Sequence, residues 1–403
     1  MTTGKTMEQT ESAQALASRI RGAREAANLT QAQAAAELGV SRPTLIAMEK
    51  GTRSVSPPEL VKLANAYGRD VATLLRPTAP PASIRAKFRT AFTAGPDKSE
   101  QLETAVSELE ELADNYVDLL RRSASRLPGR QPASRSLDYL SPDRAGEDLA
   151  TEERNRLGLG DGPIQQLREM LEVEVGLRVF FLDLPSKIAG LFIYVDPLGG
   201  CVGVNRNHPA ERRRWTMAHE YAHYLSSRDR SEVTPIGARG RIPDTERFAE
   251  AFAGNFLMPR NGITRRFHEL SRDNGGKPTP ATIVQLAHAY RVSAQALCLR
   301  LEDLALVRPG TWDRLKDHNF QPRAAAERLR LPNLPDNGSR LPYHYRTLAT
   351  QLFVDGDITE SQFARYLGTD IVGAREEFER LTSTTDVGDD GEMQVLDLLD
   401  GVE

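Results

Sequence analysis

The stretch "MAHEYAHYL" (217–225) places two histidines, His219 and His223, four positions apart with Glu220 between them. In an α-helix, residues i and i+4 lie on one face, so both imidazoles can reach the same ion. Two imidazoles and a third protein ligand can hold a Zn²⁺ ion, and a glutamate beside them can accept a proton from water. The stretch therefore predicts a helix with a zinc site, in which His219 and His223 bind the metal and Glu220 acts as the general base.

A third ligand has to come from another segment, and the next predicted helix, about 245–257, offers two carboxylates. Glu246 and Glu250 lie one helical turn apart. The neighbouring face of the helix carries a stripe of phenylalanines, which we expect to be buried in the core. Either glutamate can complete the site on this pattern. The stripe consists of Phe248, Phe252 and Phe256.

The residues before this helix pair predict a small sheet. The apolar segment 177–184 is typical of a strand, and 189–205 is typical of a hairpin that turns at Asp196-Pro197 through Gly199-Gly200. Two helices are expected ahead of them, at 148–157 and 163–174. The second hairpin strand, 201–205, precedes the helix of the two histidines, so we expect it to offer an edge to an extended peptide substrate.

The stretch "LTQAQAAAELGVSRPTLIAMEKG" (29–51) has the features of a helix-turn-helix. Thr30 can cap a first helix, Gly39 can form the turn, and Ser41 can cap a second helix. The alanines at positions 34 and 35 are small enough for the two helices to cross closely.

Residues 16–77 resemble the Xre/Cro-type helix-turn-helix of phage and bacterial repressors, through the pattern T-Q-x-x-x-A-x-x-x-G-V-S that begins at Thr30. The resemblance implies double-stranded operator DNA as a partner, with the second helix in the major groove. It implies that Gln31 contacts a phosphate and that Arg42 and Thr44 face base edges in the major groove. Lys50 and Arg53 are further phosphate candidates.

Residues 148–325 resemble the ImmA/IrrE family of metallopeptidases, through "NRNHPAERRRWTMAHEYAHYL" and the pattern E-x-x-A-x-x-F-A-x-x-F-L-M-P that follows. The resemblance implies a Zn²⁺ cofactor and favours Glu246 as the third ligand. Many members have Asn where this chain has Glu250, and this departure keeps the choice between the two carboxylates open.

These features predict a mainly α protein with a small β-sheet: an all-α helix-turn-helix domain, an α+β zincin-like metallopeptidase domain and a C-terminal helical region. Apolar residues recur at heptad spacing over 102–119, so this helix either dimerises or packs on the next domain. They are Leu102, Ala105, Leu109, Leu112, Tyr116 and Leu119. The expected order is a helix-turn-helix domain (14–77), a linker (78–97), a helical connector (98–123), a linker (124–147), the metallopeptidase-like domain (148–330), a small helical domain (333–384) and an acidic tail (385–403).

Composition sets limits on the environment of the chain. Its 403 residues carry a net charge of −4, yet residues 14–77 hold nine Lys and Arg against five Asp and Glu. A basic N-terminal segment on an acidic protein is typical of a DNA-binding module. Two distant cysteines exclude a disulfide scaffold. With no apolar run long enough for a membrane and no signal-peptide pattern at residues 1–14, we expect a cytoplasmic protein without membrane contact.

Two functions fit the sequence. In the first, a DNA-binding regulator carries a zinc endopeptidase that cleaves a helix-turn-helix repressor or the chain itself in response to a signal, and the protein is a homodimer. In the alternative, the metallopeptidase-like domain of a non-proteolytic transcription factor senses a ligand or a partner protein.

Overall fold

The computed structural model describes residues 16–17, 19–24, 27, 29–67, 71, 74, 100–129, 132–133, 135, 141–195, 197–226, 232–235, 243–273, 275–332, 338–382, 385–387 and 393–395. Contacts divide the chain into two compact units, residues 1–90 and residues 91–403. Each unit has a hydrophobic core of its own.

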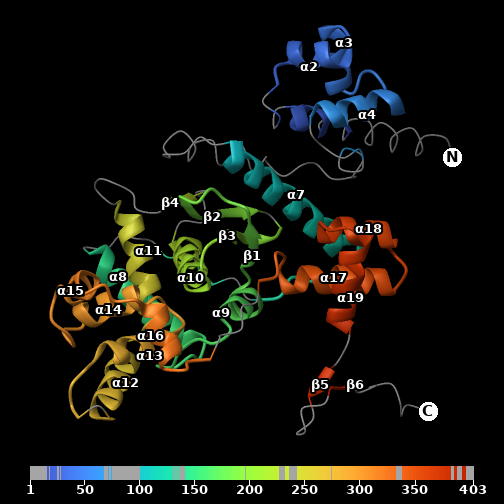
Figure 1. Ribbon diagram of the computed structural model, residues 1–403. Coiled ribbons are helices and arrows are strands. Elements are labelled where there is room, and N and C mark those ends of the chain that lie inside the picture. The colour runs from blue at the N-terminus through green and yellow to red at the C-terminus, as the bar shows by residue number, and fades with distance from the viewer. Residues whose placement is uncertain are drawn as a thin grey trace. The chain divides into compact units, whose positions relative to one another are not determined.

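The first unit contains a helix-turn-helix (Figure 1). Thr30 caps its first helix through a capping box, Gly39 takes a left-handed φ of 69°, and the Ser41 side chain accepts from the backbone N–H of Thr44. The predicted caps and turn are therefore confirmed, and the two crossing alanines are buried. The helices are α2 (Gln31–Leu38), α3 (Arg42–Glu49) and α4 (Pro57–Ala66).

The second unit is built around a four-stranded sheet with the strand order β1-β3-β2-β4. The predicted hairpin is confirmed as the antiparallel pair β2–β3, but its turn comes earlier than expected, because Gly199 and Gly200 already pair with Val195 and Tyr194 as the first residues of β3. Strand β1 runs parallel to β3. Every residue of β1 and β3 is buried, as expected for a parallel pair that is covered on both faces. The strands are β1 (Arg178–Leu182), β2 (Ile188–Val195), β3 (Gly199–Asn205) and β4 (Glu232–Pro235).

The expectation that residues 201–205 offer a free edge to a substrate is wrong. This segment belongs to β3, which is paired with β1 on one side and β2 on the other. The sequence showed the hairpin partner but not the second neighbour. At one margin of the sheet, the Phe181 N–H of β1 donates to the Arg340 carbonyl at 2.9 Å. At the other margin, no strand in the described part of the chain pairs with the outer side of β4.

Three helices pack side by side next to this sheet, and one of them contacts its strands (Figure 1). Helix α10 (Ala210–Ser226) packs on β2 and β3, and α11 (Asp244–Leu257) lies between α10 and α8 (Pro142–Arg156). A Cβ atom added at Gly146 of α8 would lie 2.6 Å from the Phe248 carbonyl oxygen, so the glycine permits this close approach. The phenylalanine stripe of α11 is fully buried.

The remaining elements of the second unit are mostly helical. The expected helix 163–174 is a short α-helix followed by a π-helical turn, and it ends at Gly176 with a φ of 81°. Two short strands also pair within the acidic tail, which its composition did not predict. These elements are α7 (Glu100–Arg122), α9 (Leu167–Met170), η1 (Leu171–Val175), α12 (Arg260–Asp273), α13 (Pro280–Tyr290), α14 (Ala294–Asp303), α15 (Thr311–Asp317), α16 (Pro322–Arg328), α17 (Tyr343–Val354), α18 (Glu360–Leu367), α19 (Ile371–Thr382), β5 (Thr385–Val387) and β6 (Met393–Val395).

The heptad seam of α7 packs inside the second unit, against α17 and β1. Tyr116 of the seam is fully buried, its hydroxyl lies 2.8 Å from Nδ1 of His344, and its ring meets that of Tyr345 edge-on. The sequence left two interpretations of the seam, dimerisation and packing on the next domain. The buried face of α7 fits the second, packing.

The expected fold class, mainly α with a small sheet, is confirmed. Both cysteines are free and buried. Among the described residues, no helix combines the length and the apolar character that crossing a membrane requires.

Candidate metal centre and DNA-binding surface

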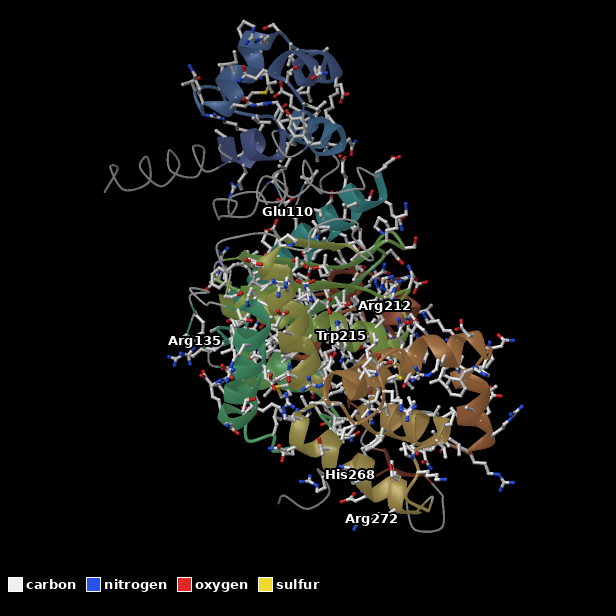
Figure 2. The ribbon with its side chains drawn as sticks, turned by 90° about the vertical axis from the view of Figure 1, so that its left-hand side faces the viewer. Glu110, Arg135, Arg212, Trp215, His268 and Arg272 are labelled. Carbon is white, nitrogen blue, oxygen red and sulfur yellow. The ribbon has the colours of Figure 1, made fainter. Side chains whose placement is uncertain are left out.

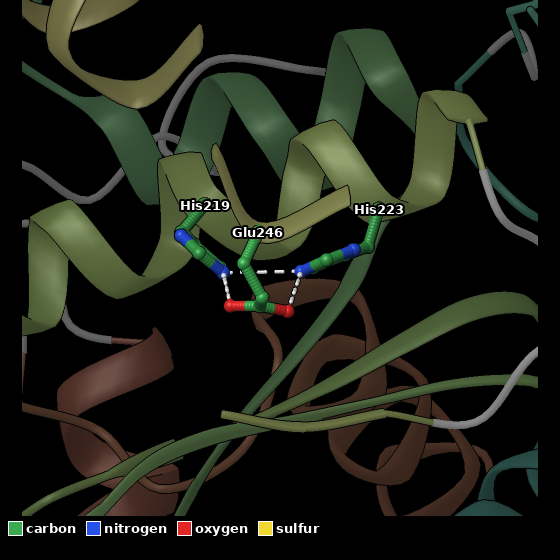
Figure 3. A group of neighbouring side chains, drawn as sticks. All are labelled: His219, His223 and Glu246. Carbon is green, nitrogen blue, oxygen red and sulfur yellow. Dashed lines mark hydrogen bonds and ion pairs between the residues drawn. The ribbon is translucent and has the colours of Figure 1, made fainter. Parts of the chain in front are cut away.

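Helix α10 brings His219 and His223 onto one buried face, as their spacing predicts (Figure 3). Their exposed fractions are 1% and 0%. The two Nε2 atoms lie 3.0 Å apart and point to the same place. Histidines on the surface can form hydrogen bonds with water. Imidazoles buried this deeply need polar partners within the protein instead.

Glu246, in the first turn of α11, reaches both imidazoles (Figure 3). One carboxylate oxygen lies 3.3 Å from Nε2 of His219 and the other 3.4 Å from Nε2 of His223. Because the buried phenylalanines anchor α11 against α8 and α10, this turn is held over the histidine face. Two helices that are separate in sequence thus bring three ligand atoms together.

The separations between these three groups fit a single Zn²⁺ ion. Tetrahedral ligands at Zn–N and Zn–O distances of about 2.0–2.1 Å lie about 3.3 Å from one another. The three observed separations are 3.0, 3.3 and 3.4 Å. Two neutral imidazoles and one carboxylate are also a donor set that zinc accepts in catalytic sites, with a fourth position left for water or substrate.

The electrostatics of the group favour a cation. Burial alone would lower the pKa of His219, but hydrogen bonds to Glu246 and Glu250 raise it to about 9. Burial would likewise raise the pKa of Glu246, yet its hydrogen bonds to both histidines hold that pKa far below the usual range. At neutral pH the carboxylate is therefore balanced by a proton on the histidine pair, and a metal ion can take the place of that proton.

Glu250 occupies a different position from Glu246. Its nearer oxygen lies 3.4 Å from Nδ1 of His219, the nitrogen on the far side of the ring from the three-atom group. The other oxygen accepts a hydrogen bond of 3.0 Å from Nε1 of Trp215, labelled in Figure 2. The side chain of Glu250 is 54% exposed, twice the 27% of Glu246. Of the two candidate carboxylates, Glu246 therefore contacts both histidines and Glu250 contacts the back of one.

Glu220 is fully buried on α10, on the side of the helix that meets the sheet. The Thr234 hydroxyl of β4 donates to its Oε1 atom at 2.7 Å. Gly190 of β2 also lies close to this oxygen: a Cβ atom added at Gly190 would be only 2.6 Å from it. Neither contact was anticipated from the sequence. A lone glycine within a strand pattern signals a close approach of another group, and Gly190 carried that signal.

The predicted base-reading residues lie at the start of α3. Arg42 is exposed at the first position of the helix, while Thr44 is half-buried and its hydroxyl lies 2.8 Å from that of Ser41. A flexible guanidinium at this end of the second helix is free to reach base edges. The short side chain of Thr44 contributes to the cap of the helix as well as to its surface.

The three predicted phosphate contacts differ in their surroundings. Lys50 is exposed at the C-terminal end of α3. Gln31 is half-buried and donates to the Glu49 carboxylate at 3.0 Å. Arg53 forms an ion pair of 2.8 Å with Glu59. A phosphate contact through Gln31 or Arg53 therefore has to share or replace an existing partner, whereas Lys50 is accessible.

Two family models match the chain. The helix-turn-helix model matches residues 20–74, which include α2, α3 and α4. The IrrE N-terminal-like domain model matches residues 173–302, which include the sheet, α10 and α11. No curated protein matches the chain. The chain is thus a fusion of a helix-turn-helix domain and an IrrE-type metallopeptidase-like domain, as the two resemblances predicted.

Proposed function

We propose that this chain is a DNA-binding transcriptional regulator that carries a zinc-dependent endopeptidase. The observation that carries the proposal is the convergence of three ligand atoms, from His219, His223 and Glu246, on one point between two helices. These residues would hold Zn²⁺. The helix-turn-helix domain supplies the DNA-binding function.

The chemistry is the hydrolysis of a peptide bond. Zn²⁺ bound in such a site supplies Lewis acidity toward water and the scissile carbonyl. Glu220, beside His219 on the same helix, would accept the proton of the attacking water and deliver it to the leaving nitrogen. An extended peptide would add to the outer side of β4, because β3 is paired on both sides.

The substrate class follows from the fusion of the two domains. A helix-turn-helix repressor is the proposed target, either a partner protein or this chain itself, cut in the linkers at 78–97 or 124–147. Cleavage would separate a DNA-binding module from its regulator in response to a signal. On DNA the chain would act as a homodimer, because two-fold symmetric operators are read by pairs of recognition helices.

Metal analysis and one substitution test the proposal. Purified wild-type protein and the Glu220→Gln variant are both expected to contain about one Zn²⁺ per chain, because the ligands are unchanged. Glu211→Gln, an exposed position in the first turn of the same helix, is the matched control. Each protein is incubated with fluorescein-labelled casein, and its own integrity is followed by mass spectrometry. Cleavage should occur in the wild type and in the control but not in Glu220→Gln.

Two outcomes would contradict this function. Wild-type protein without bound zinc would remove the peptidase assignment. The second outcome is zinc in all three proteins, no cleavage by any of them, and repression of a reporter gene that Glu220→Gln leaves unchanged. It would favour a sensing role for the metallopeptidase-like domain.

A further inference from the structure

The carboxylate of Glu220 lies against a cross-strand pair formed by Gly190 of β2 and Thr234 of β4. These two residues are Cα partners in the antiparallel β2–β4 ladder. Both residues lie close to the same atom, Oε1 of Glu220. The Thr234 hydroxyl donates a hydrogen bond to it, and Gly190 leaves room for it because glycine has no Cβ atom. A single pair in the sheet thus provides both the space and a hydrogen-bond donor for this carboxylate.

The hydrogen bond from Thr234 is short and enclosed. Its hydroxyl donates to Glu220 at 2.7 Å, and the exposed fractions of the two residues are 8% and 0%. A hydrogen bond in a buried site is stronger than one in water, because competing water is kept away. The bond therefore restricts rotation of the carboxylate.

The backbone at Gly190 makes this contact possible. A Cβ there would lie 2.6 Å from Oε1 of Glu220 and 2.6 Å from Cγ2 of Thr216, the residue one turn earlier on α10. The β2–β4 register also shifts between Ile188 and Gly190. Such irregularities re-aim residues beside functional sites, and this one lies directly before the pair that meets Glu220.

We propose that the Gly190–Thr234 pair is a cradle that orients the carboxylate of Glu220, and that Thr234 is a positioning residue for the general base. This inference rests on the proposed peptidase function. Because Thr234 holds one carboxylate oxygen, it sets the direction in which the other oxygen points. Thr234 also lies on β4, the strand proposed to receive the substrate, so the residue links the substrate edge of the sheet to the base.

A purely structural bond that only fastens β4 to α10 would have different consequences. Substitution would then lower stability and leave the surroundings of the bound metal unchanged. Three variants separate the two cases. Thr234→Val keeps the shape and removes the hydroxyl, and Thr234→Ser keeps the hydroxyl. Thr350→Val makes the same chemical change at a buried threonine of α17 in the same unit.

The first readout is the visible absorption of the protein loaded with Co²⁺, which reports the geometry around the ion. Thr234→Val should bind Co²⁺ as tightly as the wild type, because no ligand is altered, but its absorption bands should shift as Glu220 turns. Thr234→Ser and Thr350→Val should retain the wild-type spectrum. Gly190→Ala provides a second route to the same displacement and should show the shifted bands.

The second readout is the rate of cleavage of labelled casein, or of the chain itself. We expect Thr234→Val to lose about 10²-fold, the effect of misplacing a catalytic group by roughly 1 Å, and Thr234→Ser to recover most of that loss. A wild-type spectrum in Thr234→Val overturns the inference whether or not a substrate is cleaved, and leaves the proposed function intact. Failure of the wild-type protein to bind Co²⁺ or Zn²⁺ overturns both.

Discussion

The contacts of Glu246 and Glu250 predict that their substitution by glutamine affects zinc binding very differently. Glu246 lies within 3.4 Å of the facing Nε2 atoms of both His219 and His223. Glu250 lies 3.4 Å from the rear nitrogen of His219 alone. In the proposed zinc site, Glu246→Gln therefore removes a charged metal ligand, whereas Glu250→Gln alters a group that supports one.

The expected magnitudes follow from these two roles. Structural zinc sites with four ligands bind with about 10–16 kcal/mol, so one ligand contributes on the order of 3–4 kcal/mol, or about 10²–10³-fold in affinity. Partners of a metal-binding histidine contribute about 10–100-fold. The lower end of that range applies to Glu250, because its side chain is 54% exposed and solvent screens its charge.

Competition with a chromogenic chelator measures both affinities at pH 7, and a thermal melt of each metal-free variant checks that the fold is retained. Glu246→Gln should weaken binding at least tenfold more than Glu250→Gln does. Equal losses, or a greater loss in Glu250→Gln, would refute the assignment of Glu246 as the third ligand. A greater loss in Glu250→Gln would instead assign the third ligand to Glu250.

Three further predictions concern pH, DNA and packing. Because the pKa of His219 is raised to about 9, its proton competes with zinc, and affinity should rise about tenfold per pH unit up to pH 9 and then level off; a flat profile in chelator titrations would contradict this. The same shift stabilises the metal-free protein below about pH 6.5, and melts should lose that contribution as the pH rises to about 9. Arg42→Ala should weaken binding to an operator selected from random duplexes by about 1–3 kcal/mol and relax one base position, while Lys50→Ala, at an exposed phosphate candidate, should lower affinity alike for all sequences, as gel shifts would report. Gly146→Ala should destabilise the fold by about 2 kcal/mol in urea melts, because clashes with backbone atoms of α11 outweigh a helix-propensity gain of about 1 kcal/mol; Gly254→Ala, which meets only Trp215 at 3.5 Å, should instead be stabilising.

Local chemistry accounts for what could be predicted from the sequence. The turn at Gly39 and the cap at Ser41 depend on the backbone preferences of a few adjacent residues, so a short segment of sequence is enough to predict their geometry. The meeting of His219 and His223 depends on helical periodicity alone. The approach of Glu246 needed more, and only the family resemblance favoured it over Glu250.

Contacts between distant segments account for what the sequence did not reveal. Glu250 and Trp215 are 35 residues apart, and their hydrogen bond exists because α10 and α11 pack side by side. Glu250, where the resemblance would place an Asn in many members, thus contacts Trp215 and the Nδ1 atom of His219. The carboxylate lies behind His219, where an amide could also accept or donate a hydrogen bond.

The position of β3 shows how one missing neighbour changed the interpretation of the site. A hairpin pattern specifies one partner of each strand, and it leaves the other side of the second strand undetermined. Strand β1 carries four apolar residues after Arg178 and is buried along its whole length, and it pairs in parallel with β3. The outer position next to β2 is then taken by β4. This arrangement places Thr234 on the proposed substrate strand and against Glu220, so that the strand which would align a peptide also orients the group that would activate water.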